Sequence, residues 1–452
     1  MTLSARVPRP VSGPAAAWKF PAAHRSALRS GLRVVRYDLP GQLLAAAALV
    51  LDVPPEIEPE DREGIATIMS RVLDEGTARR DGSAFAAETD RLGASYSASV
   101  NTAGIQLNLE APARFFGPAL CLLAEAAAEP TFPAAEVERH VQQRLGELEQ
   151  ERAVASSLAG TERLAACFER DSRYARPVGG RAETVRRIER DAVELFYLRW
   201  VAPERATLVL AGDFQGVDVE SAVESAFGAW STKASAAPVP DQHPRAAAAS
   251  LVIADRPGAV QSQLAFGLKA PDRRAPYWAD LLVAARALGG GVSSRLSASL
   301  REDKGYTYGI YAGFTSFRRD GLFTVDTAVQ TDATALAVAE VLAVSEKFYV
   351  DGPTPAECAE AVDYMTGVHP LRHETARAIA ASAAMQAAFH LGDGYLDDLQ
   401  DALRAVTPAS AAAAFRDHVD PAELTLVVAG DAAVIGSALS SAAGREAKVI
   451  SA

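Results

Sequence analysis

Short apolar runs that end in turn signals mark several strands along the chain. Residues 43–53 read LLAAAALVLDV, and the runs ATLVLAGDF (206–214) and LTLVVAGDA (424–432) both contain Gly-Asp after a stretch of β-forming residues. Such runs are typical of buried strands that lead into turns. None of them is long or apolar enough to cross a bilayer, so the pattern predicts a soluble protein without membrane spans.

The two Gly-Asp strands belong to a long internal repeat. The second copy begins 218 residues after the first, at 424 against 206. Each copy follows an amphipathic-helix pattern and a Pro-containing turn, and each precedes a helix of small residues. A repeat of this length indicates domain duplication rather than a solenoid. We therefore predict two homologous α+β halves, 1–230 and 250–452, joined by an Ala- and Pro-rich linker over 231–249.

Residues 63–77 (EGIATIMSRVLDEGT) predict a helix in which a second, polar stripe runs beside the apolar one. The apolar stripe consists of Ile65, Ile68, Met69 and Val72, and the polar one of Thr67, Ser70, Arg71 and Asp74. A zinc peptidase places His, Glu and His at such spacings, because positions i and i+4 project from the same side of a helix. This helix has the frame of a metal site without its ligands.

The same segment resembles the active-site helix of the insulinase (pitrilysin) family of metallopeptidases, whose hallmark is H-x-x-E-H. Thr67, Ser70 and Arg71 stand in the His, Glu and His places, and Glu147 stands in the place of the third ligand. A threonine hydroxyl binds zinc poorly and an arginine repels it. We therefore expect no metal in this chain, and Glu147 is then a solvated carboxylate or a partner for Arg71.

The segment 289–314 (GGGVSSRLSASLREDKGYTYGIYAGF) resembles the signature of the family's second half. The resemblance covers nearly the whole chain and implies that each half is an antiparallel-rich sheet packed with helices. It also implies that Arg301 and Tyr308 act at the cleavage site, where a cation and a phenol can stabilise the negative carbonyl oxygen. Gly305 fits the C-cap of a short helix between them. The alternative is a surface arginine and a half-buried strand tyrosine.

The family resemblance implies a division of labour between two chains. A catalytic subunit carries H-x-x-E-H, the zinc and the general base, and a second subunit carries the Arg/Tyr pair. We predict that this chain is the second type, with no cofactor of its own, in a heterodimer that encloses a peptide held by strand addition at an edge near 97–104. The alternatives are a catalytically silent scaffold subunit, an inactive homodimer, or a self-sufficient peptidase with other ligands.

Charge and cysteine content limit which binding partners and which cellular compartment we expect for this protein. Acidic residues exceed basic ones, 57 to 45, which makes nucleic acid an unfavourable partner. Three isolated cysteines, and an N-terminus without a secretory apolar region, favour a reducing cytoplasm. The Ala- and Arg-rich composition is typical of a GC-rich bacterial genome. His369 and His373 have i, i+4 spacing but no Glu between them, so we predict a helix N-terminus there rather than a metal site.

Overall fold

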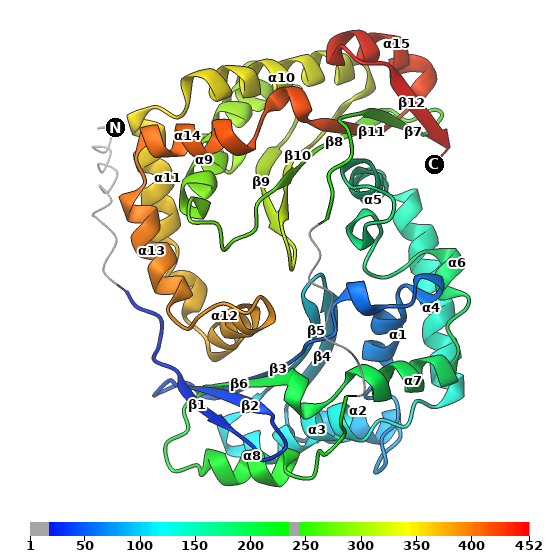
Figure 1. The fold of residues 1–452 in the computed structure, drawn as a ribbon, viewed down its shortest axis with the longest axis vertical. Helices are drawn as coiled ribbons and strands as arrows, with labels where there is room; N and C mark the ends of the chain where they lie inside the picture. The colour runs from blue at the N-terminus through cyan, green and yellow to red at the C-terminus, as the bar shows by residue number, and fades with distance from the viewer. Residues whose placement is uncertain (1–17, 235–243, 452) are drawn as a thin grey trace, which may run out of the picture.

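Two six-stranded β-sheets form the framework of the molecule, and helices pack against both (Figure 1). The computed structural model describes residues 18–234 and 244–451. In spatial order, the first sheet consists of β1 (His24–Ala27), β2 (Arg33–Asp38), β6 (Ala206–Gly212), β3 (Leu44–Leu51), β5 (Gly104–Pro112) and β4 (Ser95–Asn101). The second consists of β12 (Ala447–Ser451), β7 (Leu251–Asp255), β11 (Thr425–Gly430), β8 (Gln261–Ala270), β10 (Gly321–Gln330) and β9 (Ile310–Ser316).

The same strand arrangement occurs in both halves. In each sheet one inner pair is parallel, β2 with β6 and β7 with β11, and the strands that follow are antiparallel out to a final hairpin. The sheets differ at the opposite edge, where β1 pairs antiparallel with β2 but β12 pairs parallel with β7. This confirms the predicted α+β fold with two homologous, antiparallel-rich sheets.

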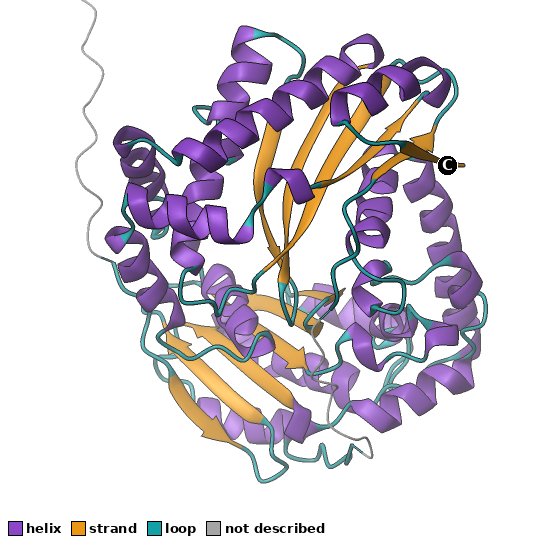
Figure 2. Cartoon of the chain, turned by 45° about the horizontal axis from the view of Figure 1, so that its top comes forward, coloured by secondary structure: helices purple, strands orange, loops and turns teal. Residues whose placement is uncertain are grey.

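Fifteen helices accompany the strands in the described part of the chain (Figure 2). Those of the first half are α1 (Ile65–Val72), α2 (Gly82–Arg91), α3 (Phe116–Ala128), α4 (Ala134–Ala153), α5 (Ala155–Cys167), α6 (Ala182–Val185), α7 (Arg190–Trp200) and α8 (Val219–Phe227). Those of the second half are α9 (Trp278–Gly289), α10 (Thr334–Asp351), α11 (Pro355–Gly367), α12 (Ala376–Ala388), α13 (Tyr395–Ala405), α14 (Pro408–His418) and α15 (Ala432–Ala443). None of the helices in the described ranges is long and apolar enough to span a membrane.

Strand β3 shows why an uninterrupted apolar run forms a strand in this fold. Its odd-numbered residues from Ala45 to Leu51 pack into the core that contains α1, α3 and α8. Its even-numbered residues, Ala46, Ala48 and Val50, pack against α12 on the other face. Successive side chains point to opposite faces of a strand, so a strand covered on both sides must be apolar throughout.

One helix of each half packs on the sheet of the other half. Helix α5 lies on β8 and β11, and α12 lies on β3 and β6 (Figure 1). Gly267 of β8 permits the approach of α5, because a Cβ there would lie 2.6 Å from the Sγ of Cys167. Arg163 of α5 forms an ion pair of 2.5 Å with Asp326 of β10. These reciprocal contacts bind the two halves together.

The turn between β9 and β10 also reaches the first half. The ring of Phe317 stacks on Tyr174 with a centroid separation of 5.0 Å, and Arg318 pairs with Asp52 at 2.5 Å. The opposite end of these strands, where Gln330 pairs with Gln261, is roughly 30 Å away along the strand direction. The sheet also meets the first half near its other end, because Arg256, in the turn before β8, donates to the backbone carbonyl of Arg152 at 3.2 Å.

Two further predictions concern the sheet edge and the linker. Residues 97–101 lie in β4, which is the edge strand of the first sheet as expected. Part of the predicted linker, residues 235–243, lies outside the described residues. The part that follows runs beside the end of α5, where the N–H of Ala247 donates to the carbonyl of Cys167 at 2.9 Å.

Candidate functional site

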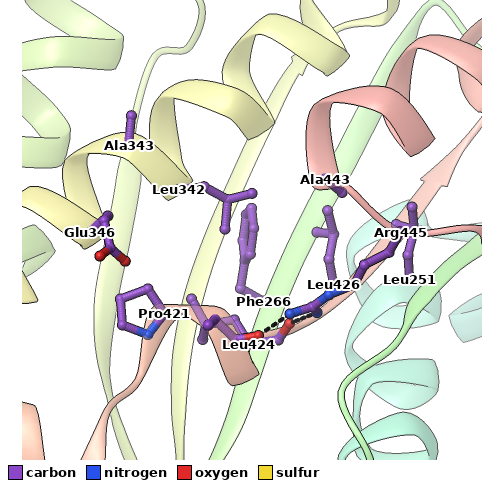
Figure 3. Close-up of a pocket in the computed structure, with 11 residues that line it drawn as sticks. Leu251, Phe266, Leu342, Ala343, Glu346, Pro421, Leu424, Leu426, Ala443 and Arg445 are labelled. Atoms are coloured by element: carbon purple, nitrogen blue, oxygen red, sulfur yellow. Dashed lines mark hydrogen bonds between the residues drawn. The ribbon is translucent and has the colours of Figure 1, made fainter.

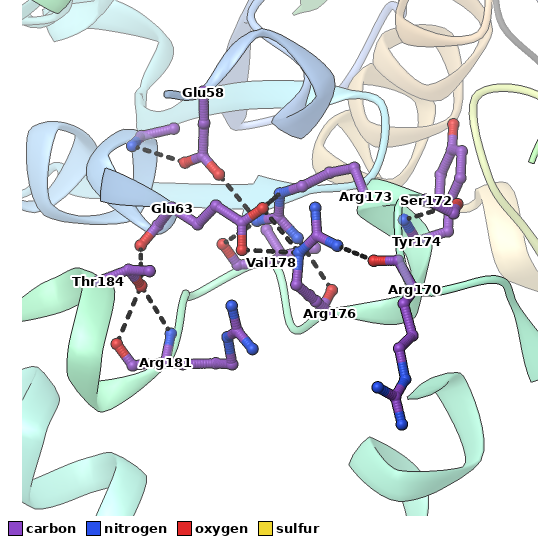
Figure 4. A network of polar contacts seen from close by, with 11 residues as sticks. Glu58, Glu63, Arg170, Ser172, Arg173, Tyr174, Arg176, Val178, Arg181 and Thr184 are labelled. Carbon is purple, nitrogen blue, oxygen red and sulfur yellow. Dashed lines mark hydrogen bonds and ion pairs between the residues drawn. The ribbon is translucent and has the colours of Figure 1, made fainter. Parts of the chain in front are cut away.

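Helix α1, which carries the degenerate motif, begins in a network of buried charges (Figure 4). Glu58 accepts a hydrogen bond from the N–H of Ala66 at 3.0 Å and forms an ion pair with Arg173 at 2.8 Å. Glu63, just before the helix, pairs with Arg176 at 2.8 Å. Buried carboxylates are stable only when they are paired and hydrogen-bonded. The network therefore fixes where α1 begins and how its side chains face α4.

The positions of the missing motif form an ion pair instead of a metal site. Arg71 donates two parallel hydrogen bonds to Glu147, 2.9 Å from Nη1 to Oε1 and 2.8 Å from Nη2 to Oε2. Arg144 adds a third at 3.1 Å. Ser70 is buried and donates its hydroxyl to the carbonyl of Thr67 at 2.9 Å. The guanidinium of Arg71 thus binds Glu147, which is the one acidic residue at these four positions.

These residues do not fit a zinc ion. The guanidinium of Arg71 repels a metal cation, and hydrogen bonds to it hold the pKa of Glu147 below its usual value. The carboxyl group is therefore ionised, and both of its oxygens accept hydrogen bonds from arginines. Across residues 18–234 and 244–451, no three His, Cys, Asp or Glu side chains gather closely enough to hold a metal. We assign this chain no step that passes through a metal.

Arg144 is the residue at this site that sequence reasoning missed. The sequence left open whether Glu147 is solvated or paired with Arg71, and the structure has it paired. Arg144 is also bound to Glu147 and to Glu151, the latter at 2.6 Å. The sequence signal for this contact was the i, i+3 spacing of Arg144 and Glu147, because residues three apart are neighbours on the surface of a helix.

Arg301 and Tyr308 lie on either side of a sharp turn. Arg301 belongs to a short π-helical segment, Ser297–Asp303, which packs beside α10. Gly305 follows with a φ of 64°, a left-handed conformation that reverses the chain at a helix end. Tyr308 lies in the loop two residues before β9. A helix end and the entry to a strand thus present the two side chains.

Both side chains line one open groove of about 640 Å³. It lies at the end of the second sheet opposite the β9–β10 turn, beside the start of α10. Other lining residues are Gln261, Glu302, Tyr306, Thr307, Gln330, Asp332 and Leu336. Tyr308 is 98% exposed, so it is not the half-buried strand tyrosine of the alternative interpretation.

The polar groups of the pair are free to bind an external ligand. The side chain of Arg301 is 42% exposed, and its ion pair among the described residues is with the neighbouring Glu302 at 3.4 Å. The Tyr308 hydroxyl makes no hydrogen bond to another described residue. A guanidinium and a phenol held in this way can both donate to an oxyanion. No histidine, cysteine or lysine is among the described residues that line the groove; its carboxylates are those of Glu302 and Asp332.

A separate pocket of about 430 Å³ lies between α10, α15 and the second sheet (Figure 3). Its walls are mainly aliphatic, with Phe266 at the base and Glu346 on α10. Arg445 points toward its edge, where it donates to the backbone carbonyls of Leu424 and Ala422. Because the guanidinium is already bound to the protein, we assign this pocket no chemistry.

The fold and the site together define an α+β protein of two similar halves, in which an ion pair joins two of the positions where the sequence resembles a zinc-peptidase motif. A model of the insulinase (peptidase M16) family matches residues 33–180, and a model of the peptidase M16 inactive domain matches residues 187–365. The chain belongs to the insulinase (peptidase M16) family. The match to the inactive type of domain runs from the last part of the first half into the second half, as far as α11.

Individual proteins agree with this assignment. An uncharacterized zinc protease of Mycobacterium leprae is 26% identical over 347 residues, which cover 76% of this chain and 77% of that protein. The crystal structure of a peptidase M16 inactive domain from Pseudomonas fluorescens superposes with a TM-score of 0.83 at 23% identity, over 90% of this chain and 98% of that one. A protease from Helicobacter pylori gives a TM-score of 0.84 at 17% identity, over 91% and 100%. These structures share the fold of this chain.

Proposed function

We propose that this chain is the non-metal subunit of a heterodimeric zinc endopeptidase. In this role Arg301 and Tyr308 donate hydrogen bonds to the scissile carbonyl oxygen as it gains negative charge. One observation carries the proposal: the Arg71–Glu147 ion pair fills the metal position, whereas the Arg/Tyr pair remains free in an open groove. If the chain had lost its role in catalysis as well as its metal site, nothing would require an exposed guanidinium and phenol at the two positions of the family motif.

The groove also supports the need for a second chain. It combines exposed donors with a lining in which no described residue is a histidine or cysteine, so a zinc site would have to come from another chain. A partner with H-x-x-E-H would hold the zinc and the general base, and each chain would form half of the wall around a peptide substrate. This chain would carry no cofactor. The acidic net charge of −12 disfavours a nucleic-acid partner, and the free cysteines favour action in a bacterial cytoplasm, where we expect no membrane partner.

The proposal is tested by producing the chain with and without an H-x-x-E-H chain from the same genome. We expect the two to co-purify and to cleave a quenched fluorescent peptide mixture only together, with zinc bound once per pair. Cleavage by this chain alone, or failure to form a complex with any such chain, would contradict the proposal.

A scaffold subunit that takes no part in hydrolysis is the alternative. It would also form a complex, so complex formation does not separate the two functions. It predicts that replacement of Arg301 and Tyr308 leaves the rate of the complex unchanged, whereas the proposed role predicts a large loss.

A further inference from the structure

A second cavity in the second half is separate from the groove of Arg301 and Tyr308. It has a volume of about 620 Å³ and lies between strand β9, helices α9, α11, α12 and α13, and the turn 369–373. Its polar side chains are those of Arg286, Tyr311, Tyr364, His369, Arg372, His373, Ser382 and Gln400. Its apolar surface consists of Leu282, Phe314, Met365, Leu396, Leu399 and Leu403. No aspartate or glutamate is among the described residues that line it.

The two arginines give this cavity an uncompensated positive charge. The guanidinium of Arg286 lies 3.7 Å from the centroid of the Tyr364 ring and also donates to a backbone carbonyl. Arg372 is exposed at the other side of the cavity. Neither arginine forms an ion pair with a carboxylate of the described chain. Cations in a concave, partly apolar site favour an anionic ligand, since the site can desolvate and bind it.

Two buried polar atoms of the wall lack a partner within the described residues. They are Nε2 of His369 and Oε1 of Gln400, whose side chains belong to residues only 8% and 5% exposed. By contrast, His373 uses both ring nitrogens, with Nδ1 2.8 Å from the His369 carbonyl and Nε2 2.9 Å from the Ser382 hydroxyl. Buried polar atoms are normally paired, so each exception requires an explanation.

The charge state of His369 follows from its surroundings. Burial lowers the pKa of its imidazole to about 4, and the ring is therefore neutral near pH 7. The negative charge of Asp397 on α13 acts to raise the pKa of His369. That carboxylate already accepts a hydrogen bond from the N–H of Phe20 at 2.9 Å. In the tautomer that carries its proton on Nε2, the neutral ring can donate to an oxygen.

We propose that this cavity binds the C-terminal residue of a peptide through its carboxylate. Arg372 and the Nε2–H of His369 would donate to the carboxylate oxygens, with Arg286 adding attraction. The backbone N–H of the same terminal residue is a donor that suits Gln400 Oε1. A fatty acid has a carboxylate but no such N–H, and Gln400 therefore favours the peptide. The apolar surface suits an aliphatic or aromatic terminal side chain.

The position of the cavity links it to extended peptides. Residues 311–314 of β9 form one wall, and β9 is the edge strand of the second sheet. A peptide anchored here by its C-terminus would lie beside a strand edge that can accept backbone pairing. The binding requires neither the partner chain nor Arg301. Only its interpretation as a substrate subsite rests on the proposed function.

Calorimetric titration of the full chain with acetyl-Ala-Ala-Leu and with its C-terminal amide tests the proposal. We expect the free acid to bind at least about tenfold more tightly than the amide, because an amide cannot form the charged contacts. Arg372→Gln should remove most of that difference. Arg377→Gln is the matched control, since Arg377 is exposed on α12 and does not line the cavity.

Three results would overturn the proposal: equal binding of acid and amide, equal effects of the two arginine substitutions, or displacement of the peptide by decanoate at similar concentration. The last would assign the cavity to fatty acids. Circular dichroism of both variants confirms that they are folded. Loss of hydrolysis by the two-chain complex with peptide binding intact would count against the proposed function and leave this site standing.

Discussion

At position 71, an arginine and a histidine would have opposite effects on the ability of the Glu147 carboxylate to bind a metal ion. The planar fork of Arg71 satisfies both oxygens of Glu147 and is permanently charged. A neutral imidazole would leave the carboxylate free to bind a divalent ion. With Thr67 in place of the other imidazole as well, this helix face forms a salt bridge and carries no imidazole ligand.

Zinc binding should therefore be recoverable. In the double variant Thr67→His/Arg71→His, two imidazoles at i and i+4 would face Glu147, giving the three protein ligands of an open zinc site. After dialysis against zinc and then against buffer, we expect about one zinc per chain in the variant and none in the wild type. Elemental analysis by mass spectrometry measures this. Zinc retained by the wild type would refute the account of this helix.

Asp74, two residues beyond the end of α1, should make stability depend on pH. Burial raises the pKa of its carboxyl to about 6, above the unfolded value of 3.8. A raised acidic pKa means that the folded state is penalised above pH 6 and that the penalty disappears as pH falls toward 3.8. Asp74→Asn should therefore stabilise the protein by on the order of 1–3 kcal/mol at pH 8.

That advantage should shrink between pH 6 and pH 4, where the wild-type carboxyl becomes protonated. Thermal denaturation of both proteins across this range measures it. A difference in melting temperature that does not change with pH would show that Asp74 does not titrate in this way.

At the scale of single elements, Gly305 determines how the Arg/Tyr pair is presented. Its φ of 64° is in the left-handed region, yet a Cβ there would meet nothing within 4 Å. Gly305→Ala should therefore destabilise the turn by roughly 1–2 kcal/mol through backbone strain alone. Gly309→Ala is the control, because its Cβ also meets nothing and its φ is not left-handed. Chemical denaturation should separate the two variants, and equal stability would contradict this role of Gly305.

Elements with a strong local pattern could be predicted from the sequence. The stripe of Ile65, Ile68 and Val72 predicted α1, and the apolar runs before the two Gly-Asp pairs predicted β6 and β11. In contrast, the apolar run of β3 indicated burial on both faces but not which helix covers the second face. That contact joins residues more than 300 positions apart in sequence, and no local pattern encodes it.

The same limit applies to the candidate site. The spacing within one motif placed Arg301 and Tyr308 on a helix end and a strand entry, and the structure has them in one groove. The cavity beside His369 could not be predicted, because its wall combines residues from 282 to 403. The sequence signal there was the pair His369 and His373, which have the i, i+4 spacing of metal ligands but lack the Glu of H-x-x-E-H.

At the scale of the whole molecule, the two halves depend on each other, because α5 packs on the second sheet and α12 packs on the first. Ala384 is fully buried where α12 meets the first sheet, and Ala381 is exposed on the same helix. Ala384→Asp should destabilise the protein by roughly 3–5 kcal/mol, since it buries an unpaired charge. Ala381→Asp should have little effect. A melting temperature equally affected by both would contradict the packing of α12 on the first half.

The most direct test of the central claim is the turnover of a peptide by the reconstituted two-chain complex with substitutions in this chain. Arg301→Ala and Tyr308→Phe should each lower kcat by about 10²–10³, as expected for loss of a donor to the developing oxyanion. Lys347→Gln, on the exposed end of α10, should leave kcat unchanged. If both substituted complexes cleave peptide at the wild-type rate, this chain does not contribute to catalysis.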